Sequence, residues 1–349
     1  MINTEHAYLF VGSYTNKDSN GINCFQFNTE NGTMEHLYSV DGIENPSYLA
    51  VDAKHQFLYA VSEKMDGTVV SYSIDPTTTK LSKVNEQPTL GAAPCYLTIN
   101  REEDCLLVVN YSGGSVCTFP IDNGKIGNMT GFVQHEGSGI RLDRQEGPHP
   151  HSVLLNETGQ IAYVPDLGLD QIVMYKLDPE ACKLVLHDKV DTHPGAGPRH
   201  LAFHPDKPYA YVINELDSTI ITFACDSFGQ LTPIQTVQTL PDGFEGNSTS
   251  ADIHITPSGK FLYGSNRGHD SLAIYKINPE NGKLTHEGYT STRGKTPRNF
   301  CLSPDGKYLI TANQESDSIV TFKINQETGQ LSEPINITTV SEPVCIKFL

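Results

Sequence analysis

Residues 297–313 read PRNFCLSPDGKYLITAN: a proline, a short apolar run, a Ser-Pro-Asp-Gly turn, and a second apolar run that ends on an asparagine. Two short apolar runs on either side of turn residues predict a β-hairpin rather than a helix. The stretch begins at Pro297 and ends sixteen residues later at Asn313. Pro297 therefore serves as an anchor whose equivalents can be sought along the chain.

The anchor occurs seven times, at intervals of 46 to 56 residues. The seven positions are Pro46, Pro94, Pro150, Pro198, Ser250, Pro297 and Pro343. A small polar residue stands sixteen positions after each of the first six anchors, without a gap: Ser62, Asn110, Asp166, Asn214, Asn266 and Asn313. A phase that holds over six repeats predicts that each repeat is one structural unit.

Each unit also contains a later turn between two strand-like runs. These turns lie at Gly32, Thr79, Gly124, Cys182, Gly229, Gly282 and Gly329. Each unit thus contains four antiparallel strands, and repeats of about 45 residues with four strands are typical of β-propeller blades. The sequence predicts an all-β, seven-bladed β-propeller of four-stranded blades that forms a single domain over residues 1–349. A two-sheet sandwich with accidental periodicity is the alternative.

The two ends of the chain each hold an incomplete unit. The last unit contains only one strand-like run, residues 344–349, and the first begins one strand late, at residues 7–12. We predict that the C-terminal strand joins the N-terminal blade, which closes the ring and removes an open sheet edge.

Composition excludes several classes of partner. The 349 residues carry 24 Lys and Arg against 41 Asp and Glu, and the net charge of −17 disfavours nucleic acid. No apolar run reaches 18 residues, which argues against a membrane partner, and the N-terminus lacks the pattern of a secretory signal. We expect a cytoplasmic protein. Its eight cysteines are scattered singly in apolar runs without C-x-x-C, and we expect buried free thiols.

Functional residues are expected where the repeats differ. In antiparallel strands, the positions one and seventeen residues after the anchor lie on the same face, at the mouth of the central channel. Charged and imidazole side chains gather there in the third to sixth units: His149, His151, Arg199, His200, Glu215, Asp252, His254, Arg267 and Arg298. Arginines at one mouth of an acidic chain favour a small anionic ligand.

Structural interpretations compete with these functional ones. Asn110 and its equivalents are first of all candidate turn caps, and Arg199 and Glu215 could form a structural ion pair. His149 and His151 together suggest metal ligands, but no further ligand stands at a recognised spacing. We therefore predict neither a metal nor another cofactor.

Five segments carry a resemblance to a known family. They are 110–115 (NYSGGS), 147–152 (GPHPHS), 194–205 (PGAGPRHLAFHP), 265–271 (SNRGHDS) and 343–349 (PVCIKFL). Together they resemble the seven-bladed propeller lactonases, a family that includes bacterial 6-phosphogluconolactonases and fungal carboxymuconate cyclases. The resemblance implies a metal-free site at the channel mouth whose catalytic set matches His151, Arg199, Glu215 and Arg267, with His149 as the alternative histidine.

The expected reaction is hydrolysis of an anionic sugar δ-lactone, foremost 6-phosphogluconolactone. His151 would be the general base, Glu215 would orient it or hold an arginine, and the arginines would bind the oxyanion and the phosphate. Seven further residues are expected around the substrate: His149, His200, Asp252, His254, Arg298, Asn110 and Gln314. A cycloisomerase acting on a carboxylated muconate and a non-enzymatic propeller that binds a sugar acid or a protein are the alternatives. We expect a monomer or a weak homo-oligomer.

Overall fold

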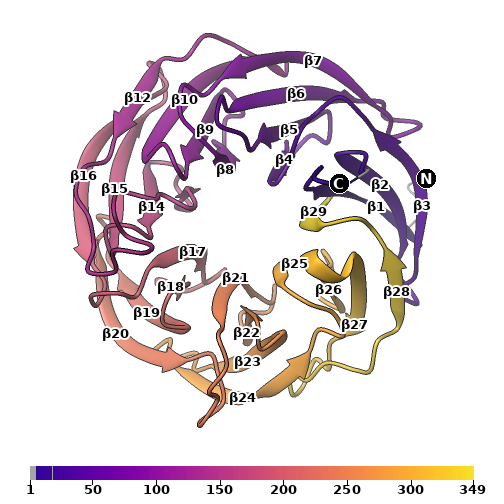
Figure 1. Ribbon diagram of the computed structural model, residues 1–349, viewed down its shortest axis with the longest axis vertical. Helices are drawn as coiled ribbons and strands as arrows, with labels where there is room; N and C mark the ends of the chain where they lie inside the picture. The colour runs from indigo at the N-terminus through magenta and orange to yellow at the C-terminus, as the bar shows by residue number, and fades with distance from the viewer. Residues whose placement is uncertain (1–4, 18) are drawn as a thin grey trace. The chain divides into compact units, whose positions relative to one another are not determined.

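The computed structural model describes residues 5–17 and 19–349. Its strands form seven antiparallel sheets (Figure 1). The contacts within the chain divide it into two compact units. The first unit comprises residues 1–39 and 200–349, and the second comprises residues 40–199. One short 3-10 helix, Gln314–Ser316, is the only helix in the described ranges, so no described helix is long enough to cross a membrane.

Four sheets lie in the first unit, except for Val40 at the end of β3 and for Pro198 and Arg199 at the start of β17, and each has four strands. The N-terminal sheet has the order β29-β1-β2-β3, and the other three run in chain order. Their bounds are β1 His6–Ser13, β2 Ile22–Asn28, β3 Met34–Val40, β17 Pro198–Phe203, β18 Tyr209–Asn214, β19 Thr219–Cys225, β20 Leu231–Gln238, β21 Thr249–Ile255, β22 Phe261–Arg267, β23 Ser271–Ile277, β24 Leu284–Ser291, β25 Pro297–Leu302, β26 Tyr308–Asn313, β27 Ser318–Lys323, β28 Asn336–Thr339 and β29 Pro343–Phe348.

Three sheets belong to the second unit. Their strands are β4 Leu49–Val51, β5 Phe57–Ser62, β6 Thr68–Ile74, β7 Leu81–Pro88, β8 Pro94–Ile99, β9 Cys105–Asn110, β10 Ser115–Asp122, β11 Lys125–Ile126, β12 Gly131–Gln134, β13 Leu154–Leu155, β14 Ile161–Asp166, β15 Gln171–Asp178 and β16 Lys183–Asp191. The middle sheet has five strands because its outer edge is split into β11 and β12, which both pair with β10. The prediction of four strands therefore needs this one correction.

The sixteen-residue phase has a direct cause in the strand register. The anchor and the residue sixteen positions later face each other across the first hairpin, as in Pro94 with Asn110, Ser250 with Asn266, and Pro297 with Asn313. An insertion between them would break this pairing, which explains why the spacing has no gap.

The seven later turns also lie as predicted. All seven residues have a positive φ, from 44° at Cys182 to 83° at Gly229. Glycine suits this conformation because it has no Cβ. At Gly124 and Gly282 a Cβ would also collide with an aromatic ring that begins the second strand of the preceding sheet, Phe57 and Tyr209 respectively. Each of these turns therefore packs against its neighbouring sheet.

The hydrophobic core lies between neighbouring sheets. In the first unit, Ile213 and Ile220 of one sheet pack with Leu262 and Ala273 of the next, and all four are fully buried. The second strand of each sheet is buried on both faces, as the unbroken burial of β26 illustrates. Burial of these apolar faces stabilises the stacking of sheets.

The C-terminal strand completes the first sheet, as predicted. β29 pairs antiparallel with β1, with Leu9 opposite Phe348 and Gly12 opposite Cys345. Figure 1 shows the yellow C-terminal strand next to the indigo N-terminal one. No edge of β1 is left open, because β2 covers its other side.

The expectation of free thiols alone is wrong. Cys105 and Cys182 form a disulfide with a Cα–Cα distance of 5.7 Å, and Cys225 is only partly buried. Cys182 occupies a turn position that is glycine in five of the seven units, and Cys105 begins β9 where other sheets carry the aromatic ring. The disulfide thus stands where other sheets have a contact between a glycine turn and an aromatic ring. The two cysteines are 77 residues apart, so the sequence alone does not indicate that they meet.

Candidate functional site

The predicted glutamate and one predicted arginine are in contact in the first unit. Glu215 directly follows β18, and Arg267 ends β22 in the next sheet. Arg267 Nη2 lies 2.9 Å from Glu215 Oε2, and a second bond of 3.2 Å runs from Nη2 to the carbonyl of Ser250. Both side chains are largely buried, so this ion pair fixes the direction of the guanidinium.

Asp252 organises a second cluster in the same unit. Its Oδ1 accepts a 2.8 Å hydrogen bond from His200 Nδ1, and its Oδ2 lies 3.1 Å from His254 Nε2. Burial by itself raises the pKa of Asp252, but the charges and hydrogen bonds of His254 and His200 outweigh it and hold the pKa well below its ordinary value. Three predicted residues therefore meet around one buried carboxylate.

Asn299 is a member of this cluster that the sequence reasoning missed. Its Nδ2 donates to Asp252 Oδ2 at 2.5 Å, and its Oδ1 accepts from the backbone N–H of Ile346 at 2.7 Å. A signal for it exists in the repeats. His200, Asp252 and Asn299 each stand two positions after an anchor, and of these three only Asn299 was not among the predicted residues.

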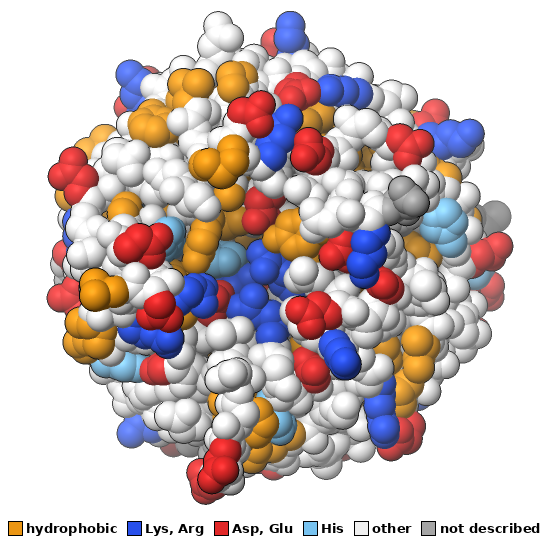
Figure 2. Space-filling model, viewed as in Figure 1, with side chains coloured by type: hydrophobic (Ala, Val, Ile, Leu, Met, Phe, Trp, Pro, Cys, Tyr) orange, Lys and Arg blue, Asp and Glu red, His pale blue; other side chains and the backbone are white. Residues whose placement is uncertain are grey.

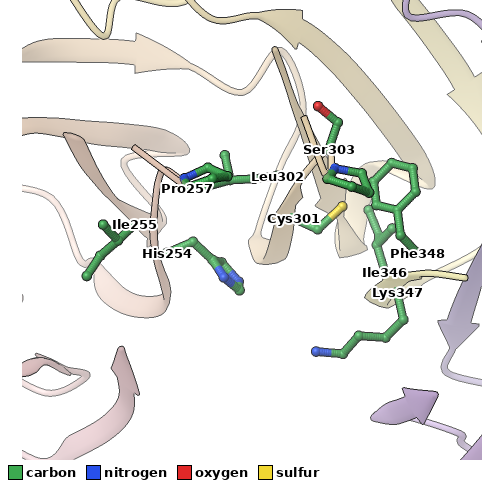
Figure 3. A pocket seen from close by; sticks show the side chains of 10 residues that line it. His254, Ile255, Pro257, Cys301, Leu302, Ser303, Ile346, Lys347 and Phe348 are labelled. Carbon is green, nitrogen blue, oxygen red and sulfur yellow. The ribbon is translucent and has the colours of Figure 1, made fainter. Parts of the chain in front are cut away.

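A pocket of about 290 Å³ opens beside this cluster. Figure 3 shows the His254 imidazole and the Lys347 ammonium group among the side chains that line it, with Cys301 between the two in this view. The lining residues lie at the C-terminal ends of β21, β25 and β29, whereas Arg298 lies at the start of β25. Sequence reasoning identified His254 but neither Cys301 nor Lys347.

The two remaining catalytic candidates belong to the second unit. Arg199 is 2% exposed, and its carbonyl accepts a hydrogen bond of 2.8 Å from Ser152 Oγ. His151 is also buried, with its Nδ1 3.7 Å from Cys95 Sγ and its ring edge-on to Tyr111 at 5.1 Å. Packing of this kind holds an imidazole in one orientation.

His149 has a different environment from His151. Its Nδ1 lies 3.0 Å from the carbonyl of Tyr111, and its Nε2 lies 3.2 Å from Glu146 Oε1. Both partners are hydrogen-bond acceptors, so the ring satisfies both only when each nitrogen carries a proton. The Tyr111 ring stacks on it at 4.6 Å. His149 is thus held between two acceptors, whereas His151 lies beside Cys95 and Tyr111.

The other predicted substrate contacts are less concentrated. The guanidinium of Arg298 lies over the ring of Tyr14 at 5.4 Å, an attractive cation–π geometry. Asn110 is fully buried and donates from Nδ2 to Ser115 Oγ, as expected of a structural cap. Gln314 begins the 3-10 helix and is partly buried. Ligand contact by these three residues stays a prediction.

The surface is electrostatically mixed. Figure 2 shows Asp and Glu side chains spread over the visible face with Lys and Arg side chains next to them. Among the described residues, no group of three or more His, Cys, Asp or Glu side chains is arranged to hold a metal ion.

Comparison with known proteins assigns the family. Residues 8–348 match the family described as "Lactonase, 7-bladed beta-propeller". The chain belongs to this lactonase family. A 6-phosphogluconolactonase of Bacillus subtilis is 35% identical over 344 residues and 97% of each chain. A 6-phosphogluconolactonase of Formosa agariphila is 36% identical over 84% of this chain and 86% of its own.

A solved structure supports the same family and fold. The periplasmic gluconolactonase of Pseudomonas aeruginosa superimposes with a TM-score of 0.94 at 32% identity, over 99% of both chains. The predicted resemblance and the all-β, seven-bladed propeller fold are thus confirmed, and the protein is a lactonase enzyme. The reactions named for these relatives support hydrolysis of sugar lactones.

Proposed function

We propose that this lactonase hydrolyses 6-phosphogluconolactone to 6-phosphogluconate. The observation that carries the proposal is the buried Glu215–Arg267 ion pair, because it presents an oriented guanidinium at a strand end where the repeats diverge. The names of the Bacillus and Formosa relatives support this substrate. An acidic chain that places arginines in these columns favours an anion such as a phosphorylated sugar acid.

His151 acts as the general base in this proposal. It takes a proton from water as the water oxygen bonds to the lactone carbonyl carbon. The guanidinium of Arg267 stabilises the oxyanion that forms, and its fixed direction reduces the reorganisation needed in the transition state. The ring carbon–oxygen bond then breaks, and His151 returns the proton to the departing oxygen. The products are a hydroxyl and a carboxylic acid, which ionises at neutral pH.

Arg199 binds the phosphate, since a guanidinium can donate two parallel hydrogen bonds to one phosphate group. Asp252 supports the site by holding His200 and His254, whereas Arg298 and Gln314 add contacts to the sugar. These steps need no metal or organic cofactor, so we expect activity to survive exhaustive dialysis against a chelator. The protein is proposed to act as a monomer or a weak homo-oligomer.

The decisive experiment compares two lactones. Proton release is followed in a pH-stat with 6-phosphogluconolactone and with glucono-δ-lactone, after subtraction of the spontaneous rate. We expect a higher kcat/KM for the phosphorylated lactone, and Arg199→Met should remove the difference. Equal kcat/KM values would refute the phosphate assignment. Conversion of a carboxylated muconate without lactone hydrolysis would refute the reaction itself.

A further inference from the structure

A recurring hydrogen bond joins the end of the second strand of one sheet to the residue that follows the outer strand of the preceding sheet. At three boundaries, an asparagine in the second strand of one sheet donates from Nδ2 to the carbonyl of a threonine that follows the outer strand of the preceding sheet. The pairs are Asn110 with Thr89, Asn266 with Thr239, and Asn313 with Thr292. In two of them, Asn110 and Asn313, the side-chain oxygen is buried and has no hydrogen-bond partner among the described residues.

The boundary between the β8–β12 sheet and the β13–β16 sheet departs from this pattern at both positions. We call it the 135–166 boundary, because His135 stands in the place of the threonine and Asp166 in the place of the asparagine. The backbone confirms the equivalence: the His135 N–H donates to the Gly114 carbonyl as the Thr89 N–H donates to the Gly67 carbonyl. The disulfide of Cys105 and Cys182 crosses this same boundary.

His135 and Asp166 are joined in a buried chain of hydrogen bonds. His135 Nδ1 lies 2.6 Å from Asp166 Oδ2, and the Tyr175 hydroxyl lies 2.7 Å from His135 Nε2. An ionised carboxylate only accepts, so the proton in the first bond lies on Nδ1 of His135, and the Tyr175 hydroxyl completes the chain at Nε2. Burial raises the pKa of Tyr175, and the charge of Asp166 raises it further, so the hydroxyl keeps its proton.

The other oxygen of Asp166, Oδ1, accepts hydrogen bonds, whereas the equivalent side-chain oxygens of Asn110 and Asn313 accept none among the described residues. Asp166 Oδ1 accepts backbone N–H bonds from His149 at 2.7 Å, Gly168 at 3.0 Å and Leu169 at 3.1 Å. The His149 carbonyl in turn accepts from the Leu167 N–H at 3.0 Å. One buried carboxylate therefore fixes the backbone at the start of the segment 149–151.

We propose that Asp166 and His135 are positioning residues for the catalytic histidine. They replace an ordinary sheet-to-sheet hydrogen bond with a buried carboxylate–imidazole hydrogen bond, whose carboxylate also sets the backbone of residues 149–151 and thereby the imidazole of His151. The same segment is tied again at its other end, where the His151 N–H donates to the Pro165 carbonyl at 3.0 Å. The role assigned to His151 rests on the proposed function.

The repeats themselves supply the test. The double variant His135→Thr/Asp166→Asn installs the pair that three other boundaries use, so the sheet-to-sheet bond is expected to be retained. We expect a melting temperature close to that of the wild type but a kcat on 6-phosphogluconolactone lower by roughly 10- to 100-fold, because small displacements of a catalytic group are costly. KM should change little. A double variant with wild-type kcat would overturn the proposal.

Asn313→Ala is the matched control. It removes the equivalent bond to Thr292 at another boundary, so it should lower the melting temperature and leave kcat unchanged. If the double variant does not fold, Tyr175→Phe tests the same chain, since it removes only the hydroxyl at His135 Nε2. A reduced kcat at unchanged KM supports positioning, and unchanged kcat contradicts it.

A second measurement separates this inference from the proposed reaction. The imidazole nitrogen resonances of His149 and His151 are compared by NMR in the wild type and the double variant. Displaced or broadened resonances support the positioning role even if the wild type proves inactive on 6-phosphogluconolactone. Unchanged resonances would refute the positioning role. If only the proposed reaction is wrong, the wild type will be inactive on 6-phosphogluconolactone while the resonances are still displaced in the variant.

Discussion

Arg267 is held by Glu215 through an ion pair of 2.9 Å, in which both side chains are largely buried. Removal of one partner leaves the other as a buried charge without its counter-ion, which is destabilising. The pair therefore contributes to folding as well as to the proposed chemistry, and variants have to separate the two effects.

Substitution of Arg267 by lysine makes this separation. Lysine keeps the charge beside Glu215 but loses the planar fork, so we expect an intact fold and a kcat reduced by about 10²- to 10³-fold. Steady-state kinetics with a thermal melt check both. If Arg267→Lys retains wild-type kcat, the oxyanion is stabilised by another group.

The two neighbouring histidines should behave differently. His151→Ala is expected to lower kcat by roughly 10²- to 10⁴-fold, as loss of a general base does. His149→Gln keeps a donor toward the Tyr111 carbonyl and should affect kcat far less. A larger loss for His149→Gln than for His151→Ala would reverse the assignment of the base.

Acid should weaken the protein through Asp252. The pKa of this carboxyl is lower in the folded state than its unfolded value of about 3.9. Its stabilising contribution is complete above that unfolded value and disappears as pH falls through the folded pKa. The free energy of unfolding in urea is measured between about pH 2 and pH 6, the range in which carboxyl groups titrate. It should fall less on acidification in Asp252→Asn than in the wild type. Parallel curves for the two proteins would contradict this.

The disulfide predicts a thiol count. Of the eight cysteines, six should react with a thiol reagent in denaturant without reductant. Reduction, or the double variant Cys105→Ala/Cys182→Gly, should lower the free energy of unfolding by about 2–5 kcal/mol. Disulfides persist in oxidising compartments. If a thiol-blocking reagent added during isolation labels all eight cysteines, the disulfide is absent and the result favours the expected cytoplasmic location.

Removal of residues 344–349 should cause a large loss of stability. The deletion exposes the edge of β1 that β29 covers, together with apolar side chains such as Ile346. A deletion variant with the wild-type melting temperature would show that β29 is dispensable. Aggregation of the variant is expected, because an exposed strand edge pairs readily with another chain.

The fold could be predicted from sequence because its periodicity is local. Pro297 and Asn313 face each other in one hairpin, so a fixed spacing along the chain reports a fixed contact in space. The positive φ at turn positions such as Gly282 is also a local requirement. Both features are set within a single sheet, and the close packing of Gly282 against Tyr209 of the neighbouring sheet only adds to the requirement for glycine.

The candidate site was predicted less completely because several of its contacts join different repeats. Asn299 reaches Asp252 across a boundary between sheets, and Asp166 reaches His135 in the same way. Cys105 and Cys182 belong to adjacent sheets as well. Such pairs become visible only when equivalent positions in consecutive repeats are compared two columns at a time.

The pairing of β29 with β1 imposes an order of events on biosynthesis. β1 leaves the ribosome long before β29, so the first sheet lacks one strand until β29 has been translated. Pairing across so long a stretch of chain also makes this step slow relative to closure of the local hairpins. One edge of β1 therefore stays unpaired, and accessible to chaperones, while the six later sheets already have all their strands.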